Sequence, residues 1–264
     1  MNQVFSKTDD SEFFEYKGYR IPVHLMKLTG GGADTFDKIA NEHIQIISVL
    51  VGINPHWNIL EIGCGIGRDA IPLVEILSPT ANYVGVDIEV ASIDWCNQNI
   101  GKRHPNFRFE FIDIYEKLYN PNGQVPLCSV RLPVEDMSVD LVILQSVFTH
   151  MLRTDIVHYL KDFARLLRCG GKVYTTFFIV DDDIRNSLTD KSYLQFKYSV
   201  SPGCFLQSLE NPTHAVAYTE EILQEMLNEA GLELAHQIIY GSWSGMRTPT
   251  NGGQDSVVLR RCGE

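Results

Sequence analysis

Residues 58–72, which read NILEIGCGIGRDAIP, decide the fold. A short apolar run is followed by glycines at alternate positions, Gly63, Gly65 and Gly67, and then by a segment with helical character. This order predicts a buried strand, a turn and a helix. Glycines at such a place either make a tight turn without a ligand or let a nucleotide-like ligand approach the backbone closely.

Strands and helices alternate outward from this stretch. Apolar runs predict strands at residues 58–62, 82–87, 107–113, 139–145, 172–180, 232–240 and 255–261. The last two strands have no helix between them, so we expect them to pair antiparallel. The pattern therefore predicts an α/β fold with a Rossmann-like, doubly wound, seven-stranded sheet that is mostly parallel and has an antiparallel C-terminal strand.

Local signals predict where the helices begin and end. Asp34 or Thr35 is expected to cap a helix over residues 36–50, and Ser92 to cap the second helix after the glycines. The Gly170-Gly171 pair is expected to end the helix before it in a left-handed turn.

The chain is expected to have one main domain, residues 36–264, preceded by an extension over residues 1–35 that covers the substrate. Residues 115–138 and 181–217 interrupt the alternation and are expected to be functional loops or lids. No basic and apolar leader is visible, and no apolar run reaches the about 18 residues that a membrane span requires, so neither a signal peptide nor a span is expected.

The net charge and the cysteine pattern indicate which kinds of partner the protein binds. The formal net charge is −11, whereas a protein that binds nucleic acid needs a basic surface. The six cysteines form no C-x-x-C pair and have no metal-ligand spacing, so we expect reduced thiols in the cytoplasm. The sequence therefore predicts a small-molecule partner, without nucleic acid or membrane, and leaves the oligomeric state open.

The residues around the glycines distinguish between ligands. Dinucleotide sites prefer G-x-G-x-x-G with a pyrophosphate on the helix N-terminus, whereas the spacing here is G-x-G-x-G and Glu61 precedes it. An acid at that place repels a pyrophosphate and suits a ligand with an ammonium group. S-adenosylmethionine is such a ligand, because it carries an ammonium and a sulfonium and no phosphate.

Two further acids end the next two predicted strands. Asp87 can accept both ribose hydroxyls, and Asp113 can either accept a hydrogen bond from an adenine amino group or cap a turn. Ile88 and Ile114 can sandwich the adenine ring or belong to the ordinary core. An NAD site also uses an acid at the place of Asp87, so an NAD(P)-dependent oxidoreductase stays open as an alternative.

Five segments in order, LEIGCGIGRDA, YVGVDIE, FIDIY, LPVEDMSVDLVILQSVFTHM and LKDFARLLRCGGKVYTTF, resemble the successive motifs of the class I S-adenosylmethionine-dependent methyltransferases. The resemblance runs from about residue 36 to residue 180, and the tail resembles a bacterial subgroup that methylates small molecules. It implies S-adenosylmethionine as cofactor and S-adenosylhomocysteine as product.

The resemblance also implies roles for residues of this chain. The methionine part of the cofactor would be held by Glu61, Gly63, Gly65 and Gly67, and Cys64 is also expected to bind the cofactor. Asp87 would hold the ribose and Asp113 the adenine, and Gln145 would lie beside the cofactor. Arg68 would either reach the cofactor carboxylate or lie on a helix surface. The segment inserted after Asp113 departs from the family pattern.

The chemistry then requires alignment and a base. Transfer of an activated sulfonium methyl depends mainly on in-line alignment, and a neutral hydroxyl acceptor also needs a general base. His150 is the predicted base, with packing near the site as the alternative. Predicted contacts to the acceptor come from His214, Tyr218, Tyr240 and Trp243, for which packing in the core or at the surface is the alternative.

Residues 181–183, DDD, can bind a divalent metal, but a helix cap or solvated loop is expected instead and no metal is predicted. The predicted function is methylation of a small molecule or sugar-like natural product on oxygen, with methylation on nitrogen as the alternative. A non-catalytic binding module and an RNA methyltransferase are further alternatives, and the charge argues against RNA.

Overall fold

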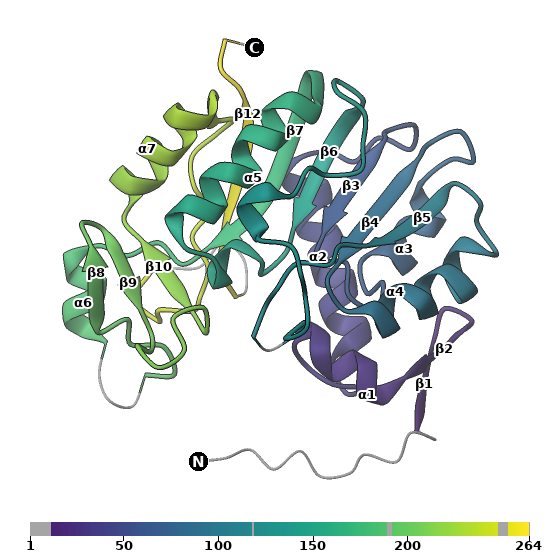
Figure 1. Cartoon of the computed structure of the whole chain (residues 1–264), viewed down its shortest axis with the longest axis horizontal. Helices are drawn as coiled ribbons and strands as arrows, with labels where there is room; N and C mark the ends of the chain where they lie inside the picture. Colours follow the sequence, from purple (N-terminus) through teal and green to yellow (C-terminus); the bar gives the residue numbers. More distant parts are fainter. Residues whose placement is uncertain (1–11, 118, 189–191, 248–252, 264) are drawn as a thin grey trace. The chain divides into compact units, whose positions relative to one another are not determined.

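The computed structural model describes residues 12–117, 119–188, 192–247 and 253–263. Its main element is a sheet with the strand order β11-β12-β7-β6-β3-β4-β5 (Figure 1). The strands are β3 (Ile59–Ile62), β4 (Tyr83–Asp87), β5 (Phe107–Phe111), β6 (Val139–Leu144), β7 (Leu167–Phe177), β11 (Leu232–Leu234) and β12 (Asp255–Arg261). β6 pairs parallel with β3 and β7, β4 pairs parallel with β5, and β12 is antiparallel to β7 and β11. The predicted fold class is confirmed.

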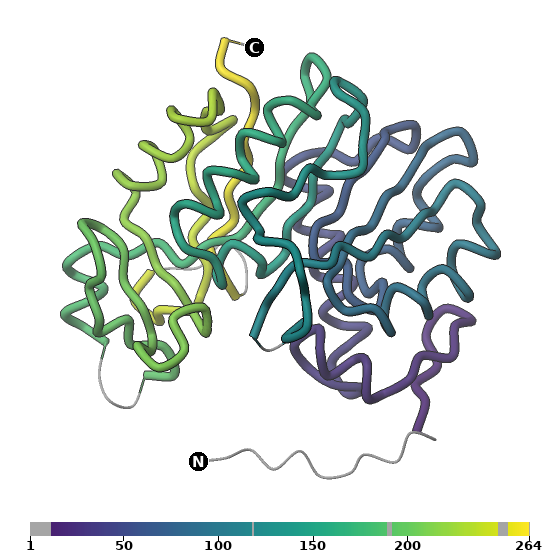
Figure 2. Tube along the Cα trace, viewed as in Figure 1, coloured from purple at the N-terminus to yellow at the C-terminus, as the bar shows by residue number. Residues whose placement is uncertain are grey.

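The chain divides into two compact units, which are described separately here. The first unit is Met1–Trp57 with Gly63–Val125, and the second is Asn58–Ile62 with Pro126–Glu264. Figure 2 follows the first unit from the purple N-terminal hairpin onward. Besides β4 and β5 it contains β1 (Phe13–Tyr16), β2 (Tyr19–Pro22), α1 (Val23–Met26), η1 (Lys27–Thr29), α2 (Phe36–Leu50), α3 (Ala70–Ile76), α4 (Val90–Cys96) and the π-turn η2 (Asn97–Gly101).

The helices of the first unit begin close to where the sequence predicts. The buried residues of α2 recur at helical spacing, because Phe36, Ala40, Ile44 and Ile47 share one face. Thr35 lies at the N-cap of α2 as predicted, but its hydroxyl makes no capping hydrogen bond.

The predicted cap of α4 is wrong. The side chain of Glu89 accepts hydrogen bonds from the Ala91 and Ser92 N–H groups, and Ser92 lies inside the first turn. A carboxylate serves as cap as well as a hydroxyl does, and its charge also matches the positive end of the helix.

The second unit is built around β6, whose residues are all buried, as expected for a strand between two parallel neighbours. It also contains η3 (Leu127–Ser129), η4 (Phe148–His150), α5 (Arg153–Leu166) and α7 (Glu220–Ala230). Glu229 of α7 forms ion pairs with Arg153 and Lys161 of α5, at 3.1 and 2.9 Å. The helices α5 and α7 therefore lie side by side (Figure 1).

Two predicted boundaries in this unit are wrong. α5 ends at Leu166 and β7 begins at Leu167, so the left-handed Gly170 (φ 73°) lies inside the strand and does not end the helix. The strand predicted over residues 232–240 ends at Leu234, and only Ile239 forms a further isolated bridge, to Ser256.

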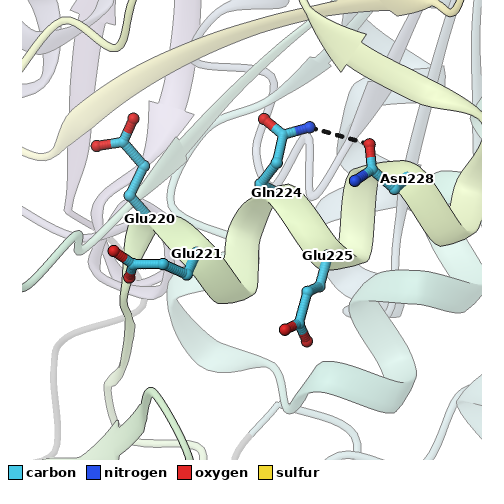
Figure 3. A pocket seen from close by; sticks show the side chains of 5 residues that line it. All are labelled: Glu220, Glu221, Gln224, Glu225 and Asn228. Atoms are coloured by element: carbon cyan, nitrogen blue, oxygen red, sulfur yellow. Dashed lines mark hydrogen bonds between the residues drawn. The ribbon is translucent and has the colours of Figure 1, made fainter.

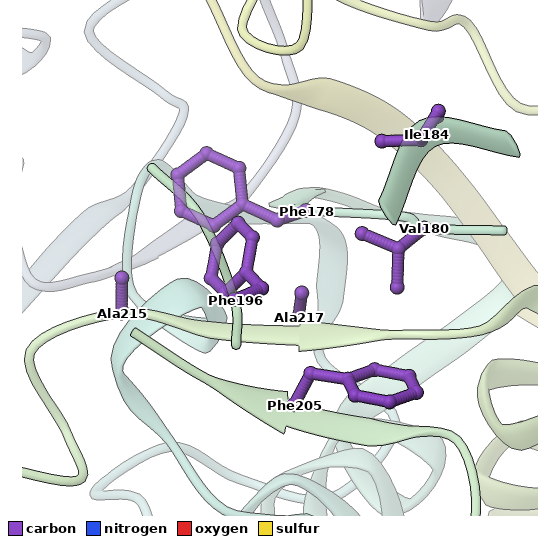
Figure 4. Close-up of a cluster of buried hydrophobic side chains, with 7 residues drawn as sticks. All are labelled: Phe178, Val180, Ile184, Phe196, Phe205, Ala215 and Ala217. Atoms are coloured by element: carbon purple, nitrogen blue, oxygen red, sulfur yellow. The ribbon is translucent and has the colours of Figure 1, made fainter. Parts of the chain in front are cut away.

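The second insert, expected as a loop or lid, has regular structure. It contains α6 (Asp182–Ser187), β8 (Tyr198–Ser201), β9 (Cys204–Leu206) and β10 (Val216–Tyr218), and the three strands form a separate antiparallel sheet in the order β10-β9-β8. Figure 4 shows an apolar cluster that the insert shares with the two residues Phe178 and Val180 that precede it; its other members are Ile184, Phe196, Phe205, Ala215 and Ala217.

Within the described ranges, no helix is long and apolar enough to cross a bilayer.

Candidate cofactor and acceptor site

The glycine loop after β3 has a left-handed backbone at all three glycines. The φ angles are 73° at Gly63, 50° at Gly65 and 75° at Gly67. The N–H groups of Gly63 and Cys64 both donate to the Val86 carbonyl of β4, at 2.8 and 3.1 Å. These bonds hold the turn against the end of β4, and the left-handed backbone explains why glycine occupies the three positions.

Close packing adds a second requirement for glycine at two of these positions. A Cβ at Gly65 would lie 2.4 Å from Cγ2 of Thr29, and one at Gly67 would lie 2.7 Å from Cδ1 of Ile100. Within the first unit, the side chains of Thr29 and Ile100 therefore pack so closely against the loop that they leave no room for a larger residue than glycine.

Asp87, the predicted ribose ligand, is fixed by backbone donors. Its Oδ2 accepts from the Gly65 N–H at 2.7 Å, and its Oδ1 accepts from Ile88 and Glu89 at 2.7 and 2.9 Å. Burial raises the pKa of Asp87, and the three N–H donors lower it without offsetting the burial. A carboxylate has about four lone-pair directions, so three backbone donors leave room for a further hydroxyl.

Arg68 is occupied in this structure. Its Nη1 donates to the carbonyls of Thr29 and Gly30, at 2.7 and 2.8 Å, and its side chain is 12% exposed. Arg68 is therefore not a solvated surface arginine. To contact a cofactor carboxylate as predicted, its guanidinium group would have to donate to the carboxylate as well as to these two carbonyls, or break its hydrogen bonds to them.

Asp69, next in the chain, pairs with His43 of α2, whose Nδ1 lies 3.0 Å from both carboxylate oxygens. Burial alone would raise the pKa of Asp69, but His43 and Arg68 outweigh it and the pKa is lowered.

Asp113, the predicted adenine ligand, is contacted by the first insert. Its Oδ1 accepts from Nδ2 of Asn120 at 3.2 Å, and its carbonyl accepts from Gln124 and Val125. Of the two predicted sandwich residues, Ile114 is buried in the core and Ile88 is partly exposed. The adenine contacts stay predictions.

In the second unit, Glu61 and Gln145 lie on neighbouring strands. Glu61 is 3% exposed and pairs with Ile143 of β6, and Gln145 follows the end of β6. The Oε1 atom of Gln145 is buried and has no hydrogen-bond partner among the described residues. The next residue, Ser146, has φ 59°, the left-handed conformation that a non-glycine residue adopts at a cost.

His150, the predicted base, lies on η4 and is exposed. Its Nδ1 lies 3.0 Å from the carbonyl oxygen of Thr213. A carbonyl only accepts, so Nδ1 carries the proton and the neutral ring keeps its lone pair on Nε2. His214, the next predicted residue, is exposed and follows Thr213, so the second unit brings His150 and the insert segment around His214 together.

The three predicted aromatic contacts differ in position. Tyr218 is fully buried, its hydroxyl donates to a backbone carbonyl 2.9 Å away, and burial raises its pKa. Trp243 donates to Asp255 at 2.8 Å, and partly exposed Tyr240 donates to Glu220 at 3.1 Å. Tyr218 and Trp243 make internal contacts of the kind that the packing alternative expects, and the contact of all three residues with an acceptor stays a prediction.

A surface hollow on α7 contains none of the predicted residues. It is lined by Glu220, Glu221, Gln224, Glu225 and Asn228 (Figure 3). All of them come from one helix, and acids in the first turn of a helix favour its dipole, so the hollow has no converging groups and needs no ligand.

The DDD segment behaves as a helix cap, because Asp181 accepts from the Ile184 N–H at 2.8 Å. Among the residues the structure describes, no group of three His, Cys, Asp or Glu side chains lies close enough to hold a metal ion.

Three residues around these positions had no signal in the sequence: Thr29, which packs against Gly65, and Thr176 and Gln254, which contact Ser146. Each is a single polar residue without a recognisable motif.

Comparison with known proteins agrees with the motifs. The family model described as "Methyltransferase domain" matches residues 60–173. The sterol 24-C-methyltransferase of Schizosaccharomyces pombe is 22% identical over 84% of this chain and 53% of its own length. This chain thus spans about half the length of that curated relative.

Two solved structures share the fold. A SAM-dependent methyltransferase from Methanosarcina mazei has a TM-score of 0.53 and 20% identity over 80% of this chain and 95% of its own. Mitomycin 7-O-methyltransferase has a TM-score of 0.55 and 11% identity over 88% of this chain and 55% of its own. The ordered motifs, the sheet topology and the family match agree: residues 60–173 match a methyltransferase domain, and the chain is similar to S-adenosylmethionine-dependent methyltransferases.

Proposed function

We propose that the chain transfers the methyl group of S-adenosylmethionine to a hydroxyl group of a small molecule. The observation that carries the choice of oxygen is the hydrogen bond between His150 Nδ1 and the Thr213 carbonyl, which leaves Nε2 as the basic atom. A hydroxyl must lose its proton during transfer, and an exposed imidazole with a free Nε2 suits that step near neutral pH.

The residues proposed to hold the cofactor fit its groups. Asp87 keeps an unused lone-pair direction for a ribose hydroxyl beside the three N–H donors that fix it. Glu61 supplies a negative charge for the methionine ammonium, and the left-handed glycines leave the loop backbone open to the methionine part. When bound, the cofactor supplies an activated methyl group, and the chain supplies its alignment.

The residues that contact the methyl acceptor are also part of the proposal. His150 removes the hydroxyl proton at Nε2, and His214 and Tyr240, both with exposed surface, contact the acceptor. Tyr218 and Trp243 support this region from the core. The net charge of −11 favours a small neutral or cationic acceptor over nucleic acid, and the reducing cytoplasm is the proposed compartment.

The division of the chain also stays a proposal: an extension over residues 1–35, and a domain over residues 36–264 with inserts at 115–138 and 181–217. The contact of Thr29 with Gly65 supports a covering role for the extension over the glycine loop. Residues 1–11 lie outside the described part of the chain.

The test separates oxygen from nitrogen as the methylated atom. Saturating S-adenosylhomocysteine is expected to raise the Tm of the protein. Paired panels of phenols, sugars and amines, each with S-adenosylmethionine, then identify turnover by release of S-adenosylhomocysteine. For a hydroxyl acceptor, His150→Gln should lower kcat about 10²- to 10⁴-fold, as expected for loss of a general base.

His236→Gln is the matched control, because Nδ1 of His236 also lies near a backbone carbonyl oxygen, that of Gln237 at 2.9 Å, and His236 is not one of the proposed site residues. Turnover of amines alone, with kcat unchanged in His150→Gln, would support the nitrogen alternative and reject the base.

A further inference from the structure

The first insert starts just after Asp113, the predicted adenine ligand, and its first part, residues 115–125, folds back onto that residue. The N–H groups of Gln124 and Val125 both donate to the Asp113 carbonyl, at 3.1 and 2.9 Å. A Cβ at Gly123 would lie 2.3 Å from the carbonyl oxygen of the residue after Asp113, so only glycine fits this return path. The backbone itself therefore places the insert beside Asp113.

One side chain of the insert holds the carboxylate of Asp113. Nδ2 of Asn120 donates to Asp113 Oδ1 at 3.2 Å and to the Ile114 carbonyl at 3.0 Å. Asn120 is itself fixed, because its N–H and its carbonyl oxygen both bond to the backbone of Glu116, at 3.0 and 3.1 Å. The carboxyl torsion of an aspartate has broad minima, so a donor on one oxygen decides where the other oxygen points. Asn120 therefore fixes Oδ1 and leaves Oδ2 for another donor.

The residue before Asn120 links the insert to the predicted ribose ligand. The N–H of Tyr119 donates to Glu116 Oε2 at 2.9 Å. Burial, and then the charges of Glu116 and Asp87, raise the pKa of Tyr119. The Tyr119 hydroxyl thus lies near enough to Asp87 for that charge to act on it, and the insert is close to both acids that are predicted to hold the nucleoside.

We propose that Asn120 is a positioning residue for adenine recognition: it holds Oδ1 of Asp113, so that Oδ2 receives a hydrogen of the adenine amino group. The first insert then covers the nucleoside end of the cofactor site. This inference rests on the proposed function and names a residue that selects the base of its cofactor. The family resemblance assigns no role to the insert, which departs from the family pattern.

The probes are S-adenosylhomocysteine and S-inosylhomocysteine, in which a carbonyl oxygen replaces the amino group of the base. Calorimetric titration of the full chain near pH 8 measures the Kd of each. An amino group donates to a carboxylate, whereas a carbonyl oxygen only accepts and is repelled by it. Wild type should therefore bind S-adenosylhomocysteine about 10- to 100-fold more tightly, as one hydrogen bond to a charged acceptor implies. Adenosine and inosine repeat the comparison without the methionine part.

A substitution of Asn120 then tests its role. Asn120→Ala removes the donor to Asp113, so the preference for adenine should fall several-fold. Asn122→Ala is the matched control, because it changes the same residue type in the same insert, and within the described part of the chain its side chain makes no hydrogen bond to Asp113. The control should keep the wild-type preference.

Asn120→Asp is the sharper variant, because it nearly preserves the shape of the side chain. Two neighbouring carboxyl groups share a proton in mild acid, and a protonated carboxyl donates as the amide does. The preference for adenine should therefore be close to that of wild type near pH 5 and several-fold lower near pH 8. A general loss of structure would not be recovered in acid.

Each result decides one part. A wild-type preference of one overturns base recognition by Asp113 and with it the role of Asn120. An unchanged preference in Asn120→Ala, or a preference in Asn120→Asp that does not depend on pH, overturns the positioning role. If S-adenosylhomocysteine does not bind but adenosine still binds more tightly than inosine, the proposed function fails and base recognition stands. No binding of any of the four ligands rejects both.

Discussion

At the glycine loop, the polar groups are already paired within the chain: Gly65 donates to Asp87, and Arg68 donates to the carbonyls of Thr29 and Gly30. At the end of β6, Gln145 Oε1 has no partner among the described residues, although its neighbour Ser146 is held by Thr176. The polar groups of the loop are therefore held in place by the chain itself, whereas the end of β6 keeps a buried acceptor atom that the described residues leave unused.

The largest effect expected from this comparison is at Gly67. Gly67→Ala meets both a left-handed backbone and Ile100, so it should lower the free energy of unfolding by about 3 kcal/mol, since left-handed alanine costs about 1–2 and overpacking a further 1–3. Gly170→Ala is the control, because Gly170 has φ 73° and nothing within 4 Å of the added Cβ. Urea unfolding measures both, and equal losses would show that close packing does not constrain the loop.

A smaller effect is expected at Arg68. Arg68→Ala releases the Thr29 and Gly30 carbonyls, so the amide of Gly32, bonded to Thr35 Oγ1, should exchange with solvent about tenfold faster, as loss of roughly 1.4 kcal/mol predicts. Hydrogen exchange followed by NMR measures this rate.

Arg103→Ala is the matched control for Arg68. Arg103 also binds a backbone carbonyl of the N-terminal segment, that of Gly18 at 2.9 Å, but within the described part of the chain it makes no hydrogen bond to Thr29 or Gly30. The same acceleration of Gly32 in both variants would mean that Arg68 does not specifically hold this segment.

The smallest effect is expected at His43. Because the pKa of Asp69 is lowered in the folded state, Asp69 stabilises the fold above its ordinary pKa of 3.8, and this contribution is lost as the pH falls through the folded pKa. His43→Ala should therefore cost about 1 kcal/mol near pH 6, and less in acid. Urea unfolding at several pH values measures the difference, and a cost that grows toward acid would contradict the assignment.

The sequence was sufficient where short-range pattern and backbone geometry decide the outcome. The apolar run of β6, the alternation of strands and helices, and the turn at the glycines after β3 all follow from local pattern. The cap of α4 was missed because Glu89 and Ser92 are both chemically able to cap, and only the backbone path selects one.

Contacts over long sequence distances could not be predicted. Gln254 and Ser146 are 108 positions apart, and neither residue type marks the other. The small sheet of the second insert was also missed, because the residues of β8, Tyr198–Ser201, are all exposed and show no buried alternation. In both cases the overall chain path brings the residues together, and the residue types are compatible with the contact without predicting it.

The central claim is that the glycine loop and Asp87 hold an S-adenosyl ligand and no phosphorylated dinucleotide. Isothermal titration calorimetry of S-adenosylhomocysteine and NADH into wild type and Asp87→Ala tests it most directly. The account predicts that wild type binds one S-adenosylhomocysteine per chain and gives no heat with NADH. In Asp87→Ala, affinity should fall about 10- to 100-fold, as loss of one hydrogen bond to a charged acceptor implies. Saturable NADH binding to wild type, or unchanged S-adenosylhomocysteine affinity in the variant, would contradict the account.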